Sequence, residues 1–416
     1  MLCIRTTGDY KNHVVACKEI TFEEFKKMAS DTLRRGKIWR KKCTLWVVIL
    51  CLPGALRVAG GDNPHPPKFV GSQSCSSSSC HGGAAVKQNE FTIWSKQDFH
   101  RERPVARLET RRAEVITEAM GIGSPLQANS CTICHAPLQT VPAEQLAPEI
   151  KVIEGISCEN CHAPAENWLR SHTRKDWTTA DRVQAGMRDL KNLYVRANTC
   201  VACHQNVEFG IRHAGHPELI FELDGQCAAE PRHWQKSGDK PGPQIWLVGQ
   251  AVALREISWQ LSRETGANPS LHGQWEGLLW LMQLTGQVEN HLPTLDSSGK
   301  ESYQQVQQWS DELAKAAANL NWSEDLTRKC LNSLAETGEA FAAHEATAAI
   351  QARRAERLVL ALDRLLQGSG RADASSELNH KLDRLFADVQ SLSDFNAAQF
   401  AQHLNEFHTS LALASN

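Results

Sequence analysis

The sequence predicts a mainly α-helical protein with little regular sheet, in which a cysteine- and histidine-rich domain precedes a helical bundle. Two observations support this prediction. Paired cysteines that adjoin histidines cluster between residues 75 and 216. After Cys227, apolar residues recur with the 3.6-residue period of a helix. With 416 residues, 41% hydrophobic and 22% charged, the composition is that of an ordinary soluble protein and excludes collagen-like, disordered and polytopic membrane proteins.

A basic cluster followed by a short apolar run predicts an export leader over residues 1–60. The basic residues lie in 34–42, the apolar run covers 43–56, and small residues surround Ala59. This order is typical of a secretory signal, and the run is shorter than the roughly 20 residues of a membrane-spanning helix. Because Arg57 interrupts the cleavage region, an uncleaved membrane anchor is the alternative. We therefore expect a periplasmic or otherwise exported protein, soluble or attached to the membrane by this segment.

Three segments between residues 61 and 235 match Cys-x-x-Cys-His, and a fourth has four residues between its cysteines. Their residues are Cys131, Cys134 and His135; Cys158, Cys161 and His162; Cys200, Cys203 and His204; and, with the wider spacing, Cys75, Cys80 and His81. In c-type cytochromes the two thiols bind the haem covalently and the histidine binds its iron. With two intervening residues, one helical turn presents both sulfurs to the haem. A bridge of four serines is flexible enough to bring the more widely spaced cysteines of the other motif into the same arrangement.

Other uses of paired cysteines explain this pattern less well. Disulfides would not require a histidine after every second cysteine, zinc sites have no need of an adjacent histidine in each pair, and thioredoxin-like chemistry needs one such motif. We therefore predict four covalently bound c-type haems, with His81, His135, His162 and His204 as proximal iron ligands.

The distal side of each iron decides between electron transfer and catalysis. A second histidine gives a low-spin, electron-transferring haem, whereas an open position permits ligand binding. More histidines are available than four irons need, so all four could be bis-His. We favour His100, His172 and His216 as distal ligands; His213, close to His216, is either a ligand or an orienting neighbour. His65 and His233 are weaker candidates.

Parts of residues 70–225 resemble the cytochrome c554 family, tetrahaem electron carriers known from ammonia-oxidising bacteria. Residues 155–162 (GISCENCH), followed closely by His172, are similar to the third haem segment of that family and its distal histidine. Residues 91–100 resemble the element from Trp94 to His100 after the first motif, although they are one residue longer than expected. Residues 213–222 resemble a Gly-His-Pro element after the last haem. The resemblance implies electron transfer between closely packed haems and a five-coordinate iron at the second motif, that of His135.

The second half is predicted to be an antiparallel bundle of about six helices over residues 244–416, joined by a linker at 236–243. Apolar stripes run from Tyr303 to Leu320, from Leu326 to Leu334, from Leu358 to Leu365 and from Leu378 to Leu392. Ser323 is expected to cap a helix, and the glycines at 368 and 370 to end one. Cys227 and Cys330 are either an interdomain disulfide or buried thiols. The role of this domain is not indicated by any motif.

The function predicted from these features is electron transfer through four mostly bis-His haems, by a carrier rather than an enzyme. The alternative is an oxidoreductase in which one five-coordinate haem acts on a small nitrogen or sulfur compound. Without residues 1–60 the formal net charge falls from −2 to −9, since the leader holds 12 basic and 5 acidic residues. Such an acidic protein is expected to dock to a basic redox partner and not to nucleic acid.

Overall fold

The computed structural model describes residues 65–234, 241–264, 266, 268–295, 301–342, 346–370 and 376–413. The predicted leader at 1–60 lies outside these residues. Among the helices described, none has the length and apolar character needed to cross a membrane. Within the described ranges, β pairing is limited to one isolated bridge between Phe69 and Leu146, which confirms the mainly α-helical class.

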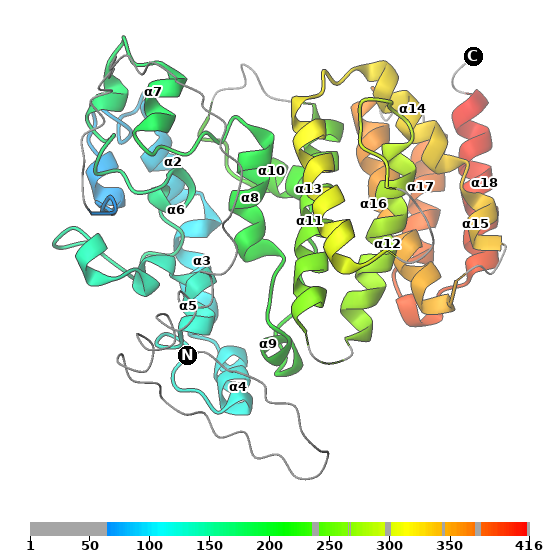
Figure 1. The fold of residues 1–416 in the computed structure, drawn as a ribbon, viewed down its shortest axis with the longest axis horizontal. Helices are drawn as coiled ribbons and strands as arrows, with labels where there is room; N and C mark the ends of the chain where they lie inside the picture. The colour runs from blue at the N-terminus through cyan, green and yellow to red at the C-terminus, as the bar shows by residue number, and fades with distance from the viewer. Residues whose placement is uncertain are drawn as a thin grey trace, which may run out of the picture. The chain divides into compact units, whose positions relative to one another are not determined.

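The cysteine-rich part consists of short helices joined by long loops (Figure 1). The α-helices are α2 (Glu90–Lys96), α3 (Phe99–Leu108), α4 (Arg111–Met120), α5 (Asn129–His135), α6 (Cys158–His162), α7 (Thr179–Gln184), α8 (Leu193–His204), α9 (Phe209–His213) and α10 (Leu223–Ala229). The 3₁₀ turns are η1 (Ser72–Cys75), η2 (Pro137–Thr140), η3 (Ala143–Gln145) and η4 (Ser171–Thr173).

Local sequence sets the ends of the helices that lead to the second motif. Asp98 caps α3 by accepting a hydrogen bond from the backbone N–H of His100 (2.9 Å). Thr110 caps α4 through the N–H of Ala113 (3.4 Å). Gly121, with φ +65°, ends α4 in the left-handed conformation that glycine adopts at low cost. These caps define the ends of α3 and α4, two short helices against which neighbouring segments are held.

The second half forms the predicted helical bundle. Its elements are α11 (Gly242–Arg263), α12 (Pro269–Gly286), α13 (Tyr303–Asn319), α14 (Glu324–Ala335), α15 (Gly338–Ala342), α16 (Ala348–Gly368), α17 (Ser376–Asp388), η5 (Leu392–Asp394) and α18 (Ala397–Leu413). Ser323 accepts a hydrogen bond from Leu326 N–H (3.1 Å), which confirms the predicted cap of α14. As predicted, α16 ends at Gly368, and Gly370 follows with φ +70°.

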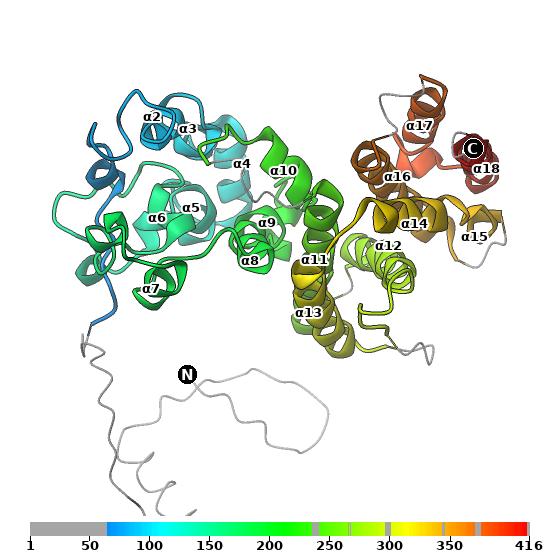
Figure 2. The same cartoon turned by 90° about the horizontal axis from the view of Figure 1, so that it is seen from above.

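The core of the bundle forms around α11, which is buried on most of its surface. This helix packs against α12, α13 and α16 (Figure 2). Trp246 on α11 and Trp275 on α12 are buried, whereas Trp259 is 38% exposed at the end of α11. Cys330 is a buried free thiol in the same core, and Cys227 is a half-buried free thiol on α10.

The helix of the fourth motif shares the core of the bundle. Ala197 and Val201 on α8 and Leu223 on α10 belong to one buried apolar cluster with Leu254 of α11. The structure starts α11 at Gly242, inside the predicted linker at 236–243, of which residues 236–240 lie outside the described ranges. The fourth motif is therefore held by bundle packing as well as by its own domain.

Candidate functional site

Three of the four motifs occupy the last turn of a helix that ends at the motif histidine. Helix α5 ends at His135, α6 at His162 and α8 at His204. In each, the two cysteines lie three residues apart on one turn, as the spacing predicts. The wider first motif begins at the last residue of η1, Cys75, and continues as a turn that closes through a hydrogen bond from His81 N–H to the Cys75 carbonyl (3.3 Å).

The motifs contact one another in two pairs. The thiol of Cys158 lies close enough to Cys75 to lower the pKa of the Cys75 thiol, so the first motif meets the third. The thiol of Cys203 likewise lowers the pKa of Cys134, so the second motif meets the fourth. Burial raises the pKa of the Cys161 thiol to about 12. The attachment cysteines thus converge from segments far apart in the sequence.

A buried carboxylate joins the first motif to the third. Glu159, 1% exposed, lies between the two cysteines of the third motif. It accepts hydrogen bonds from the backbone N–H groups of Val70 (3.0 Å), Gly71 (2.7 Å) and Ala165 (2.7 Å). Burial raises the pKa of Glu159, and these three bonds oppose the rise. The glutamate therefore holds the chain that approaches Cys75 against α6.

A close backbone crossing joins the third motif to the helix that carries His100. Gly155 has φ +78°, and a Cβ there would lie 2.0 Å from the Arg101 carbonyl oxygen, so only glycine fits. The next residue, Ile156, donates its N–H to the His100 carbonyl (2.9 Å) and accepts a hydrogen bond from Trp94 Nε1 (3.0 Å). This crossing explains the glycine that precedes the third motif.

His81 and His172 face each other across the first motif. Their ring centres lie 6.0 Å apart and their planes differ by 12°. His81 Nδ1 is 3.0 Å from Glu90 Oε2, and His172 Nδ1 donates to the Trp168 carbonyl (3.1 Å). Both rings are thus held at Nδ1, which leaves Nε2 of each to face a ligand.

His100 and His204 form a second pair. Their ring centres lie 6.1 Å apart with planes at 82°. His100 Nδ1 is 3.0 Å from Asp98 Oδ1, and His204 Nδ1 is 3.2 Å from the Gln226 side-chain amide. Burial, followed by the proximity of His100, lowers the pKa of His204. Burial lowers the pKa of His100, but the hydrogen bond and charge of Asp98 outweigh it, so the net change is upward.

The two remaining motif histidines are half-buried, and their pKa values are lowered. His135 Nδ1 donates to the Pro104 carbonyl (2.8 Å), and burial, followed by the charges of His216 and Arg107, lowers its pKa. Burial, followed by repulsion from His233, lowers the pKa of His162 to about 4. Neutral imidazole is the form that binds a metal.

The other distal candidates lie in different surroundings. His216 donates from Nδ1 to the Pro217 carbonyl (2.8 Å). His213 is exposed and stacks on Phe209, with ring centres 5.7 Å apart. His65 is exposed. His233 lies 3.9 Å from Glu230, whose carboxylate is grouped with Asp98 and His100.

The sequence did not indicate three carboxylates that support these groups. Glu90 and Asp98 contact the rings of His81 and His100, whereas Glu159 binds backbone N–H groups next to the motifs. Two of these carboxylates could have been predicted from their positions in the sequence, since Asp98 precedes His100 by two residues and Glu159 lies within a motif. A ligating histidine generally donates its second ring nitrogen to such a partner.

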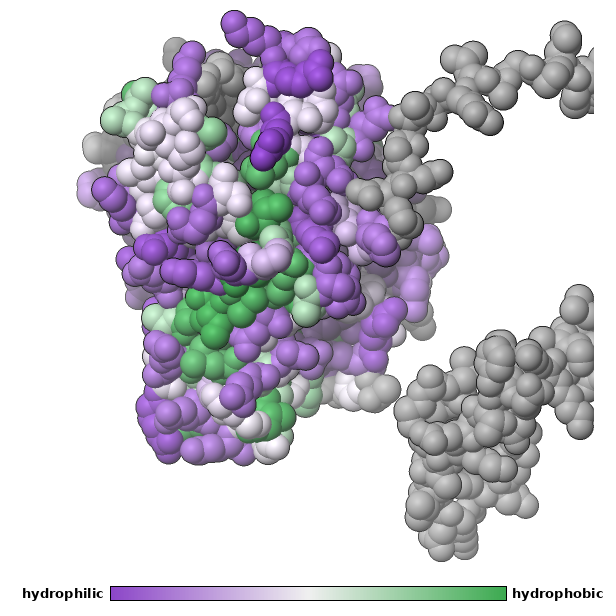
Figure 3. Space-filling model, turned by 90° about the vertical axis from the view of Figure 1, so that its left-hand side faces the viewer, coloured by the Kyte–Doolittle hydropathy of each residue, from purple (hydrophilic) through white to green (hydrophobic). Residues whose placement is uncertain are grey.

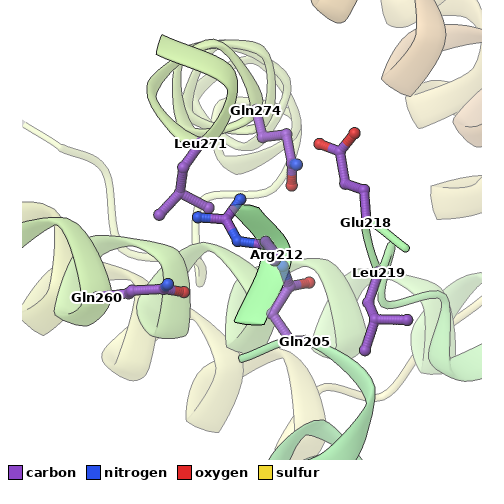
Figure 4. A pocket seen from close by; sticks show the side chains of 7 residues that line it. All are labelled: Gln205, Arg212, Glu218, Leu219, Gln260, Leu271 and Gln274. Carbon is purple, nitrogen blue, oxygen red and sulfur yellow. The ribbon is translucent and has the colours of Figure 1, made fainter. Parts of the chain in front are cut away.

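The pocket in Figure 4 lies between α9, α11 and α12, and Gln205, which follows His204, is one of its lining residues. Arg212 projects into it, and its guanidinium lies 3.8 Å from Glu264. It is lined mainly by polar side chains: Gln205, Arg212, Glu218, Leu219, Gln260, Leu271 and Gln274. This small polar space suits a water rather than a cofactor.

Figure 3 shows a continuous apolar stretch on the face of the cysteine-rich part.

The residues fit c-type haem. Two imidazole nitrogens on opposite sides of one metal ion, each about 2.0 Å from it, hold their ring centres roughly 6 Å apart. The 6.0 and 6.1 Å separations of the two pairs agree with this value. Thiol pairs beside each motif histidine, and partners at Nδ1 of His81, His135 and His204, complete the donor set.

This donor set is the one that covalently bound c-type haem requires. Residues 74–163 match the family described as cytochrome c554 and c-prime. The match confirms the resemblance predicted from the sequence and supports an electron carrier with covalently bound haem. It spans the first three motifs, and the fourth lies beyond it. No significant match was found among curated proteins, and none among solved structures.

Proposed function

We propose that the chain is an exported tetrahaem cytochrome that transfers electrons through four, mostly bis-His haems. The observation that carries the proposal is the pairing of histidine rings at 6.0 and 6.1 Å, one ring of each pair coming from an attachment motif. A haem iron bound in this way accepts and releases one electron.

The protein groups around each iron favour fast electron exchange over catalysis. Cysteines at the four motifs fix the cofactors covalently, and His81, His135, His162 and His204 are the proximal ligands. Distal histidines such as His172 and His100 occupy the position that a substrate would need. Hydrogen bonds from Nδ1 to Glu90, Asp98 and backbone carbonyls keep the rings in one orientation, so little rearrangement accompanies a change of charge.

The contacts between motifs support transfer along the chain of cofactors. Cys75 contacts Cys158 and Cys134 contacts Cys203, so the cofactors of each pair would be neighbours. His100 of the segment after the first motif pairs with His204 of the fourth, which connects the two pairs. A continuous route through all four motifs follows from these contacts.

The compartment and partners follow from the sequence. The leader at 1–60 would export the chain to the periplasm, and its apolar run at 43–56 would attach it to a membrane if it is not cleaved. The net charge of −9 beyond residue 60 favours a basic redox partner.

The experiment that tests this function is production of the full chain with the c-type maturation apparatus, followed by haem counting and electron paramagnetic resonance (EPR). Four covalent haems per chain, nearly all low-spin in the oxidised state, are expected. Fewer than four haems would contradict the tetrahaem assignment. A high-spin haem that binds nitric oxide or hydroxylamine would favour instead the oxidoreductase that acts on a small nitrogen or sulfur compound.

A further inference from the structure

The histidine of the fourth motif contacts a glutamine side chain at its second ring nitrogen. His204 ends α8, and its Nδ1 lies 3.2 Å from Nε2 of Gln226 on α10. An amide nitrogen can only donate, so in this arrangement Nδ1 accepts and the ring proton lies on Nε2. A histidine that binds iron through Nε2 has lost that proton and carries its remaining one on Nδ1. Iron binding therefore requires an acceptor where Nε2 of Gln226 now lies.

The same amide has an oxygen that can meet this requirement. Among the described residues, Oε1 of Gln226 is buried without a hydrogen-bond partner, whereas buried polar atoms generally have one. Rotation by half a turn about the last side-chain bond exchanges the two ends of the amide. Oε1 then faces Nδ1 of His204 and accepts the proton that iron binding places there.

Helix α10, which carries Gln226, is held by the bundle. Leu223 is fully buried against Gly249 of α11, where a Cβ would lie 2.7 Å from the Cβ of Leu223. Asp224 forms an ion pair with Arg364 of α16, in which Oδ2 and Nε lie 2.7 Å apart. Gln226 follows two residues further along the same helix. Its distance from the fourth motif is therefore set by the packing of α10 on α11 and α16.

The segment that enters α10 is tied both to the bundle and to the fourth motif. Gln250 of α11 donates from Nε2 to the Phe221 carbonyl (3.1 Å). Phe221 in turn donates its N–H to Oε1 of Gln205 (3.3 Å), the residue that follows His204. Contacts from the bundle thus reach the end of α8 and the start of α10, the two helices that carry His204 and Gln226.

We propose that Gln226 accepts a hydrogen bond from Nδ1–H of His204 and is a positioning residue of the fourth haem, presented by the helical bundle. The proposal rests on the proposed function, because it needs a haem at this motif. An acceptor at Nδ1 makes the imidazole a stronger donor to iron, which favours the ferric state and lowers the reduction potential. The bundle, for which no motif indicates a role, then helps to set the potential of this haem.

The test compares the haem-loaded full chain with Gln226→Leu, Gln226→Glu and Gln351→Leu variants. Gln351 of α16 is the matched control, because it is buried and its Oε1 also has no hydrogen-bond partner among the described residues. Its Nε2 donates to the Ala340 carbonyl within the bundle (2.9 Å). The Gln351 variant thus reports the effect of removing a buried amide that does not contact a motif histidine.

The reduction potential is measured by a redox titration followed by EPR, on the low-spin signal that His100→Ala abolishes. Because the rings of His100 and His204 are paired, this signal reports the fourth haem. We expect Q226L to shift its midpoint potential upward and Q351L to leave it unchanged. Q226E keeps an acceptor oxygen and should leave the potential at or below the wild-type value. A purely structural role would not make the direction depend on whether position 226 offers an acceptor.

Three results would overturn the inference while leaving the proposed function intact. They are a Q226L protein with four haems whose signal titrates at or below the wild-type potential, an equal upward shift in Q226L and Q351L, and a Q226E potential above that of the wild type. The last result decides the matter even where Q226L does not fold.

Failure of the proposed function has a different appearance. A wild type without haem on the peptide that contains Cys200 and Cys203 would contradict the tetrahaem assignment, and a His100→Ala protein that keeps every low-spin signal would contradict the histidine pairing. Mass spectrometry of that peptide and the EPR spectrum of H100A therefore separate the two failures.

Discussion

The rings of His81 and His172 are nearly parallel, with planes 12° apart at a centre-to-centre distance of 6.0 Å. The rings of His100 and His204, at almost the same distance, are nearly perpendicular at 82°. Axial imidazoles with parallel planes split the iron d orbitals unequally, whereas perpendicular planes leave two of them close in energy. The two pairs should therefore give different spectra.

The first prediction concerns those spectra. The oxidised protein should show a rhombic low-spin EPR signal from the His81 and His172 pair and a signal with one large g value from the His100 and His204 pair. His172→Ala should remove the first signal and produce one high-spin haem, while His100→Ala should remove the second. His65→Ala, an exposed site, is the matched control. Loss of the same signal in both variants would contradict the pairing.

The second prediction concerns Glu159. Replacing it with glutamine puts an NH₂ group against at least one of three backbone N–H donors, so Glu159→Gln should lower the free energy of unfolding by about 1–3 kcal/mol. Glu166→Gln is the control, since Glu166 is exposed and accepts a hydrogen bond from Lys68 N–H. Urea unfolding followed by haem absorbance measures both. Equal stability of the two variants would show that the buried carboxylate does not join the motifs.

The third prediction concerns the contact between the fourth motif helix and the bundle. Tyr194 on α8 donates to Asp311 Oδ1 on α13 (2.6 Å), and Arg255 and Lys315 also bind this carboxylate. Burial opposes ionisation, but the hydrogen bonds of Lys315, Tyr194 and Arg255 prevail and lower the pKa of Asp311 to about 2. Its contribution, about 1 kcal/mol after allowance for solvent screening, is present above pH 4 and lost as the pH falls through 2.

Asp311→Asn should therefore reduce stability at pH 7 and have little effect near pH 2. The measurement is urea unfolding at both pH values, monitored by circular dichroism and by haem absorbance. Tyr194→Phe and the double variant complete a cycle that isolates the coupling between α8 and α13. Additive effects of the two substitutions would contradict a direct contribution of this bond.

The fourth prediction concerns a buried pair that joins the segment after His216 to the bundle. Glu222 lies 3.3 Å from Arg357 of α16, whose side chain is 1% exposed. Burial outweighs the attraction of Arg357 and raises the pKa of Glu222 to about 7. The folded state then binds a proton more tightly than the unfolded state, so stability should fall as the pH rises from about 4.5 to 7, by up to roughly 3 kcal/mol.

Glu222→Gln should remove this part of the pH dependence. Urea unfolding at pH 5 and pH 7.5 compares the two proteins, with Glu218→Gln, a more exposed partner of Arg353, as the control. A wild type whose stability rises over this range relative to E222Q would mean that Arg357 keeps Glu222 ionised.

The sequence could predict those features that depend on local spacing. Cys-x-x-Cys-His predicts three attachment motifs, and the serine bridge between Cys75 and Cys80 a fourth, because the chemistry needs neighbouring thiols and an adjacent imidazole. The 3.6-residue period predicted the bundle helices, and Ser323 predicted a helix start, since capping depends on a few consecutive residues.

What only the tertiary structure decided is which distant segments meet. No local pattern indicates that His172 faces His81 or that His100 faces His204, because each pairing depends on the folding of intervening helices. The same holds for Glu159, whose hydrogen-bond partners come from segments before and after it, and for α8, whose buried face completes the core around α11. The sequence alone shows which residues have the chemistry of an iron ligand. Which two histidines face each other depends on the tertiary structure.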